Sequence, residues 1–165
     1  MTRIYFASNR DVLSESSDTG HIFGERFNAH GPQCFRVGKA EVDLASADPK
    51  NDRAWSVGKT ALYPETLDSS APAGATLGSA AFLDELRLLL KSEDRDVIAY
   101  LPGFANTFEN SLQRAAALQT LYSSAAQQVI VVLFSWHRTA GCSRHGTISP
   151  IARMPPPRAS RWGER

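Results

Sequence analysis

Residues 96–134 read DVIAYLPGFANTFENSLQRAAALQTLYSSAAQQVIVVLF. The first apolar run, 96–101, is too short for a helix and is typical of a buried strand. Beyond the break at Pro102-Gly103, apolar side chains recur at helical spacing, at Phe108, Leu112, Ala115, Leu118 and Tyr122. Residues 128–134 then give the strongest strand pattern of the chain. Strand, helix and strand in this order predict one βαβ unit, and therefore a parallel sheet and an α/β fold.

Local signals predict further elements around this unit. Asn106 and Glu109 have the spacing of a capping box, so we expect the helix to start there and to run to about residue 124. The other expected elements are strands at 4–7 and 34–42, a helix at 79–91, a loop at 11–31, and a long connection at 44–78 with at most one short strand near 55–57.

The charge of the chain changes sign near residue 136. Residues 1–136 carry 12 Lys+Arg and 16 Asp+Glu, a net of −4, whereas residues 137–165 carry six Arg and one acid, Glu164, a net of +5. The second segment also holds four prolines and few aliphatic residues, so it cannot bury much apolar surface. We therefore expect an α/β domain at 1–136 and a disordered, basic tail at 137–165.

Composition and motifs exclude several classes of function. No apolar stretch approaches the roughly 18 residues that a membrane span needs, and no signal peptide is evident, so the expected location is cytoplasmic. Cys34 and Cys142 are too few for a disulfide scaffold or a zinc site, and the histidines lack metal-ligand spacing, so we expect no metal and no cofactor. Gly58-Lys59-Thr60 lacks the first glycine of a P-loop, and no Gly-x-Ser-x-Gly elbow follows a strand.

The turn after the strand at 96–101 is the candidate for chemistry. Backbone amides just beyond the carboxyl end of a strand can stabilise the negative oxygen of an acyl-transfer transition state. Gly103 would allow a sharp turn there, and the amides of Phe104 and Ala105 would be the donors, so these three are the candidate catalytic residues. A strand-to-helix turn without chemistry is the alternative, and the residues of the turn alone favour that alternative.

Two stretches resemble a bacterial α/β-hydrolase family of largely uncharacterised function. Residues 97–116, VIAYLPGFANTFENSLQRAA, and residues 132–136, VLFSW, are similar to the family's strand ending in His-Gly-Tyr/Phe-Asn, its Phe-Glu-Asp helix with Arg-Ala-Ala, and its strand ending in Phe-Ser-Trp-Pro-Ser. The opening stretch from Tyr5 to Arg10, Phe23-Gly24 and the segment 37–42 are also similar, so the resemblance covers about residues 3–136. Pro102 stands where the family has His, which affects hydrogen bonding around the turn.

The resemblance implies a serine hydrolase of ester or similar acyl bonds, with a small acyl compound as the substrate of an intact relative. The family's nucleophilic Ser, acid and His lie further downstream, so we expect this chain to be inactive by itself. One permitted back-translation, read from the third base of the His137 codon, restores Pro after Trp136 and then a segment of the family's kind. Residues 137–165 are therefore interpreted as out of frame, and the chain as truncated by a frameshift.

Loss of later strands would leave the strand at 129–134 as an open apolar edge, which predicts poor solubility or self-association. Two other interpretations stay open. One is a small α/β binding module whose basic tail holds an acidic partner, with binding that is salt-sensitive and lost when 137–165 are deleted. The other is a pseudogene product with no role. No specific nucleic-acid partner and no membrane span are expected.

Overall fold

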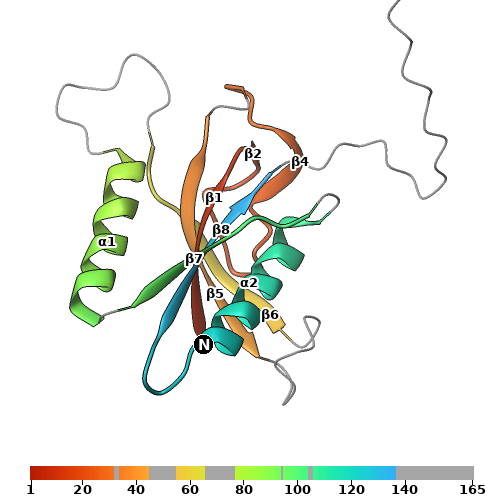
Figure 1. The fold of residues 1–165 in the computed structure, drawn as a ribbon. Coiled ribbons are helices and arrows are strands. Elements are labelled where there is room, and N and C mark those ends of the chain that lie inside the picture. The colour runs from red at the N-terminus through yellow and green to blue at the C-terminus, as the bar shows by residue number, and fades with distance from the viewer. Residues whose placement is uncertain (32–33, 45–54, 66–76, 94, 104–105, 137–165) are drawn as a thin grey trace, which may run out of the picture.

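The computed structural model describes residues 1–31, 34–44, 55–65, 77–93, 95–103 and 106–136. These residues form a six-stranded sheet in the order β3-β6-β5-β1-β8-β7, a separate pair of strands, β2 and β4, and two helices (Figure 1). The elements are β1 Thr2–Ser8, β2 Arg10–Val12, β3 Ser16–Ser17, β4 Phe23–Phe27, β5 Arg36–Leu44, β6 Trp55–Leu62, α1 Gly78–Glu93, β7 Asp96–Tyr100, α2 Phe108–Tyr122 and β8 Val129–Ser135.

The sheet is mixed, with a parallel and an antiparallel half. β7, β8 and β1 run parallel, whereas β1, β5, β6 and β3 are antiparallel in succession. β7 and β8 are neighbours, paired from Asp96↔Val129 to Tyr100↔Leu133, and α2 connects them. The predicted βαβ unit and the α/β class are therefore confirmed.

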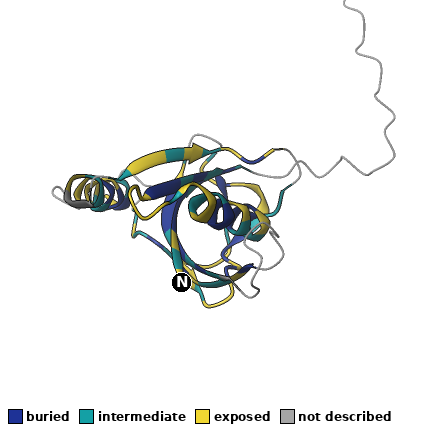
Figure 2. Ribbon diagram, turned by 60° about the horizontal axis from the view of Figure 1, so that its bottom comes forward, coloured by how far each residue is buried: buried dark blue, intermediate teal, exposed yellow. Residues whose placement is uncertain are grey.

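The two helices cover opposite faces of the sheet. Along β1, Ile4 and Phe6 point into the cluster that packs against α2, whereas Tyr5 points into the cluster that packs against α1. Because side chains alternate across a strand, these two clusters lie on the two faces. Figure 2 shows the central strands as the buried part of the molecule, with exposed residues on the outer sides of the helices.

Phe108, at the start of α2, lies at the centre of the larger cluster. Its side chain is 2% exposed. The ring packs edge-to-face on Phe6 at 4.9 Å and on Phe23 at 4.8 Å between ring centroids. The first turn of α2 is therefore anchored on β1 and β4, and its position fixes the turn that precedes it.

The sequence prediction of a loop at 11–31 is wrong, because that segment contains β3 and β4 and the last residues of β2. The strand expected near 55–57 is present, but it is longer than predicted and extends over Trp55–Leu62. The short strands carry too few residues for a periodic pattern. The polar stretch Gly58-Lys59-Thr60 weakens the pattern of the longer one, which pairing with β5 and β3 holds in place.

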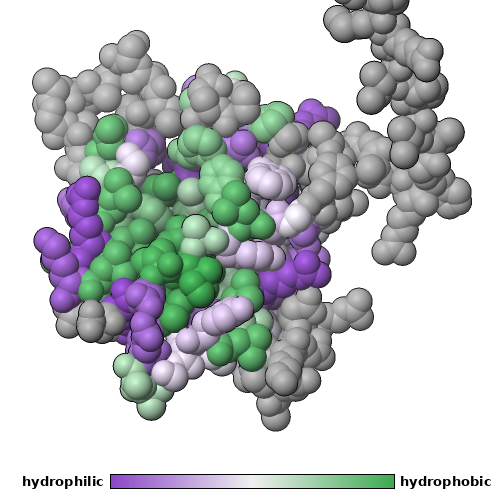
Figure 3. Space-filling model, in the orientation of Figure 1, coloured by the Kyte–Doolittle hydropathy of each residue, from purple (hydrophilic) through white to green (hydrophobic). Residues whose placement is uncertain are grey.

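In the described sheet β7 lies at one edge and the two-residue strand β3 at the other, and the strand predicted to be an edge is internal. β8 lies between β1 and β7, so the prediction for 129–134 is wrong. The strand predicted at 96–101 is confirmed as β7, but the prediction that it is buried is wrong, because Val97 is 45% and Leu101 56% exposed. An apolar run in the sequence indicates that a strand is hydrophobic, but it does not indicate whether the strand lies inside the sheet or at its edge. Figure 3 shows the resulting hydrophobic surface, in green, on the side where β7 lies in front.

The start of α2 differs by one residue from the prediction. Thr107 is the N-cap, and its Oγ1 accepts a hydrogen bond from the amide of Asn110 at 3.1 Å. The Asn106 side chain instead donates to the carbonyl of Gly103. At the other end Tyr122 is 63% exposed, so the buried stripe of α2 stops before it. Neither helix in the described part of the chain is long and apolar enough to cross a membrane.

Candidate functional site

The carboxyl ends of β1, β8 and β7 meet at one edge of the sheet, where ligands bind in many α/β proteins. Ser8 ends β1 and Ser135 ends β8, and these two residues lie opposite each other in the register. Both are fully buried. The β7–α2 turn, which holds the candidate oxyanion residues, starts at the same edge. The sequence prediction thus selects a turn at the edge where binding is expected.

Arg10 connects the segments that meet at this edge. Its side chain is 3% exposed. Nε donates to Ser135 Oγ at 3.1 Å, and Nη2 donates to the Asn106 carbonyl at 2.8 Å. Nη1 lies 3.5 Å from the Gly24 carbonyl. A single guanidinium therefore holds together the end of β8, the β7–α2 turn and β4.

Sequence reasoning missed this role of Arg10. The sequence shows only an arginine two residues after the end of an apolar strand, and charged side chains are common at such positions. Its buried position follows from partners up to 125 residues away in the chain, which local spacing does not show.

The β7–α2 turn is described at both of its ends. Phe104 and Ala105 lie outside the described residues, so the prediction that their amides are donors stays a prediction. The sequence analysis expected Gly103 to provide the backbone freedom for a sharp turn. Gly103 is exposed, but its backbone is not in the left-handed region, so its conformation does not require glycine. Among the described residues, a Cβ placed on Gly103 would have Asn106 Nδ2 alone within reach, at 4.0 Å.

Aromatic side chains flank the end of β8. Phe134 packs edge-to-face on Phe35 at 5.3 Å between ring centroids, and Trp136 packs on Phe134 at 6.4 Å. Phe35 remains 43% exposed. Because side chains alternate across a strand, these rings lie on the α1 face of the sheet, whereas the Ser135 hydroxyl points to the α2 face with Val131 and Leu133.

The described residues contain no assembled nucleophile and base. His21 Nδ1 lies 3.4 Å from Glu109 Oε1, and the His21 side chain is 70% exposed. Within the described ranges no serine hydroxyl or cysteine thiol hydrogen-bonds to the ring of His21 or His30. Both histidines lie in exposed loops, as the sequence predicted. His137 and His145 lie outside the described residues.

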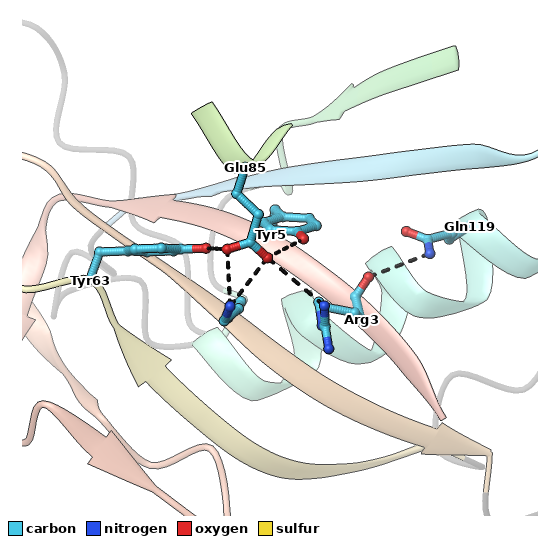
Figure 4. A network of polar contacts seen from close by, with 6 residues as sticks. Arg3, Tyr5, Tyr63, Glu85 and Gln119 are labelled. Atoms are coloured by element: carbon cyan, nitrogen blue, oxygen red, sulfur yellow. Dashed lines mark hydrogen bonds and ion pairs between the residues drawn. The ribbon is translucent and has the colours of Figure 1, made fainter. Parts of the chain in front are cut away.

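A second polar cluster lies on the α1 side of the sheet and centres on Glu85 (Figure 4). Its carboxylate accepts hydrogen bonds from the hydroxyls of Tyr5, at 2.8 Å, and Tyr63. Lys39 Nζ lies 3.0 Å from Oε2, and Arg3 Nη1 lies 3.8 Å from Oε1. One side chain of α1 is thus held by β1, β5 and the residue that follows β6.

The ionisation of this cluster fits a structural role. Burial opposes the charge of Glu85, but hydrogen bonds from Tyr63, Tyr5 and Lys39 outweigh it and hold the pKa of the carboxyl below its ordinary value of 4.5. Burial, together with the hydrogen bond to Glu85, raises the pKa of Tyr5 to about 12. The same two causes raise the pKa of Tyr63. Both tyrosines therefore stay protonated donors, and the cluster fastens α1 to the sheet.

The P-loop-like stretch and the cysteines, which the sequence analysis set aside, are not part of a recognisable site in the described residues. Gly58-Lys59-Thr60 is part of β6 and not of a turn before a helix, which agrees with the rejection of a P-loop. Cys34 is a free thiol. No group of three or more His, Cys, Asp or Glu within the described residues could hold a metal ion. Two stretches approach the Gly-x-Ser-x-Gly pattern without matching it, 74–78 and 141–145; residues 74–76 and 141–145, which include Cys142, lie outside the described residues.

Comparisons of the chain with protein-family models, curated proteins and solved structures gave no match. The resemblance to an α/β-hydrolase family therefore depends on the motifs of the sequence, and the site is interpreted from its own geometry.

Proposed function

We propose that this chain is the amino-terminal part of an α/β-hydrolase-like domain, which supplies the oxyanion turn for an ester or similar acyl substrate but no catalytic nucleophile. The observation that carries the proposal is the position of the β7–α2 turn. It begins at the carboxyl edge of the parallel strands, and Arg10 fixes its Asn106 carbonyl to the end of β8. An amide donor must be preorganised to stabilise an oxyanion, and the contact with Arg10 holds Asn106, the residue that follows the expected donors, in place.

The surroundings of the turn suit an acyl compound. Among the described residues only Asn106 comes near Gly103, which leaves a carbonyl oxygen room to approach the backbone. Phe35, Phe134 and Trp136, on the α1 face at the end of β8, offer apolar contacts to an acyl group that extends across the carboxyl edge.

We expect no turnover by this chain because hydrolysis needs an activated hydroxyl. The hydroxyls of Ser8 and Ser135 are fully buried, and Ser135 Oγ accepts a hydrogen bond from Arg10, which is no base. A serine without a neighbouring base is a weak nucleophile. In this proposal the nucleophile belongs to a further strand that would pair with the free edge of β7, since its hydroxyl must reach the same point as the amides.

Reaction with a fluorophosphonate probe tests the absence of a nucleophile. The intact chain should show no covalent adduct by mass spectrometry and no hydrolysis of p-nitrophenyl acetate above the rate in buffer. A stoichiometric adduct on any serine would overturn that part of the proposal.

The gene itself tests the hydrolase part. Reading the DNA beyond the Trp136 codon in the frame that starts at the third base of the His137 codon should give Gly-x-Ser-x-Gly, followed by an acid and a histidine. A chain extended in that frame should then be labelled by the probe at the elbow serine, and its Phe104→Pro variant, which removes one amide donor, should lose about 10²–10³-fold in kcat. A frame without these residues would refute the hydrolase assignment.

A further inference from the structure

The sheet splits between β1 and β8 at their amino ends, opposite the edge of the proposed hydrolase site. In the described sheet, pairing of these strands begins only at Tyr5↔Val132 and continues to Ser8↔Ser135. β1 is nevertheless paired with β5 from Thr2, and β8 with β7 from Val129, so both strands continue beyond the split. Figure 1 shows the amino end of β8 diverging from β1 near the N-terminus.

A side chain of α2 replaces the missing ladder. Gln119 Oε1 accepts a hydrogen bond from the Val131 amide at 2.9 Å. Gln119 Nε2 donates to the Arg3 carbonyl at 3.4 Å (Figure 4). One carboxamide thus bridges the two strands where their backbones have moved apart. The separation is therefore built into the fold, since a helix residue satisfies backbone groups that the ladder leaves open.

A cavity of about 620 Å³ opens at this split. Its size is within the range of roughly 300–1,000 Å³ that is typical of small-molecule sites. The cavity is lined by two arginines, Arg3 and Arg95, and none of the described side chains that line it is acidic. Thr120, Ser123 and Gln128 add polar groups, and Leu89 and Ile130 add apolar contacts.

The charges of the lining favour an anion. Arg3 is 53% exposed at its side chain, and its contact with Glu85 is long, at 3.8 Å. Lys39 is closer to Glu85, at 3.0 Å, and Tyr5 and Tyr63 donate to the same carboxylate. The Arg3 guanidinium interacts with Tyr5 as well as Glu85, but it has five N–H groups, more than these two partners use, so donors remain for a ligand. Guanidinium groups match carboxylate and phosphate oxygens in geometry.

We propose that this cavity binds a small anionic ligand, whose carboxylate or phosphate group lies between Arg3 and Arg95 and whose hydrocarbon or ring portion lies against Leu89 and Ile130. The hydroxyls of Thr120 and Ser123 on α2 donate further hydrogen bonds to the oxyanion. This site is independent of the proposed acyl site, because it lies at the amino ends of the strands.

Titration of the intact, isotope-labelled chain with phenyl phosphate, benzoate and inorganic phosphate, followed by amide NMR, tests the proposal. We expect saturable shifts that are largest for amides at the split, such as those of Thr2, Ser123 and Gln128. Phenyl phosphate and benzoate should both bind more tightly than inorganic phosphate. Whichever of these two has the lower Kd shows whether the site prefers a phosphate or a carboxylate group. No saturable shift with any of the three anions, or shifts confined to the carboxyl edge, would overturn the proposal.

Matched variants separate the site from general charge. Arg95→Gln and Arg3→Gln should each weaken binding of the preferred anion by about tenfold in Kd, which corresponds to about 1.4 kcal/mol. Arg87→Gln makes the same change of charge on an exposed side chain of α1 that pairs with Asp84, and it should leave Kd unchanged. If Arg87→Gln weakened binding as much as Arg95→Gln, the cavity would not be the site. Thr120→Val, which preserves all charges, should also weaken binding and is the second test if an arginine variant fails to fold.

Discussion

Replacing Phe108 with alanine removes the ring that anchors the first turn of α2 to the sheet. Phe108 is 2% exposed and packs edge-to-face on Phe6 and Phe23. Because it directly follows the N-cap Thr107, its loss affects both the core and the turn of the candidate site. The perturbation therefore tests whether the β7–α2 turn depends on this packing.

The expected cost is about 4 kcal/mol of unfolding free energy. Substitutions of Phe by Ala in cores cost about 3–5 kcal/mol, including the cavity that remains. The upper half of that range applies because the ring is almost fully buried and loses two aromatic contacts, each worth about 0.5–1.5 kcal/mol. With a slope of about 2 kcal/mol per molar urea, the midpoint of unfolding should fall by about 2 M.

Urea unfolding followed by far-UV circular dichroism measures this difference. Leu121→Ala is the matched control, because Leu121 lies on the same helix and is 50% exposed. The control should change the unfolding free energy by less than about 0.5 kcal/mol. A Phe108→Ala variant within about 1 kcal/mol of the unsubstituted chain would refute the packing described for α2.

Three further predictions concern the buried Arg10, the carboxylate of Glu85 and the edge strand β7. Arg10→Gln should cost roughly 2–4 kcal/mol in urea unfolding, because buried acceptors on β8 and in the turn lose charged donors, and it should speed hydrogen exchange in the first turn of α2. The pKa of Glu85 is lower in the folded chain than its ordinary 4.5, so its carboxylate stabilises the fold above that pH, and this contribution is lost as the pH falls through 4.5 and below. Glu85→Gln should therefore flatten the acid side of the stability–pH curve. Val97→Lys places a charge on the exposed edge strand β7 and should raise the monomer fraction in size-exclusion chromatography with light scattering.

Each of these has a contrary outcome. Arg87→Gln, on the surface of α1, is the control for Arg10→Gln. If the two substitutions lower the unfolding free energy equally, the buried contacts of Arg10 do not stabilise the fold more than a surface ion pair does. If the unfolding free energy of Glu85→Gln falls as steeply with acidification as that of the unsubstituted chain, other carboxylates cause the acid sensitivity. If the unsubstituted chain is already monomeric, or if Val97→Lys leaves its association unchanged, β7 is not the associating edge.

Sequence-local information was sufficient for part of the candidate site. The turn after the strand at 96–101 was selected because a strand, a break and a capped helix follow one another within a few residues, and it does begin at the carboxyl edge of the parallel strands. The contacts that hold it were not predictable in this way. Arg10 reaches Ser135 across 125 residues, and nothing in the spacing of a chain records which distant acceptors will surround a guanidinium.

The sequence by itself determined the elements whose signal is local: the βαβ unit, the amphipathic helix α1 and the long strands β1, β5 and β8. Hydrophobic periodicity reports which side of an element is buried, and it needs only neighbouring residues. The tertiary structure alone decided that β7 is the edge and β8 internal, that β2, β3 and β4 form at all, and that Gln119 bridges a split between β1 and β8. These features depend on pairing between segments far apart in the chain, as in the contact of Gln119 with Arg3 across 116 residues, and such pairing is selected by the whole fold and not by any one stretch.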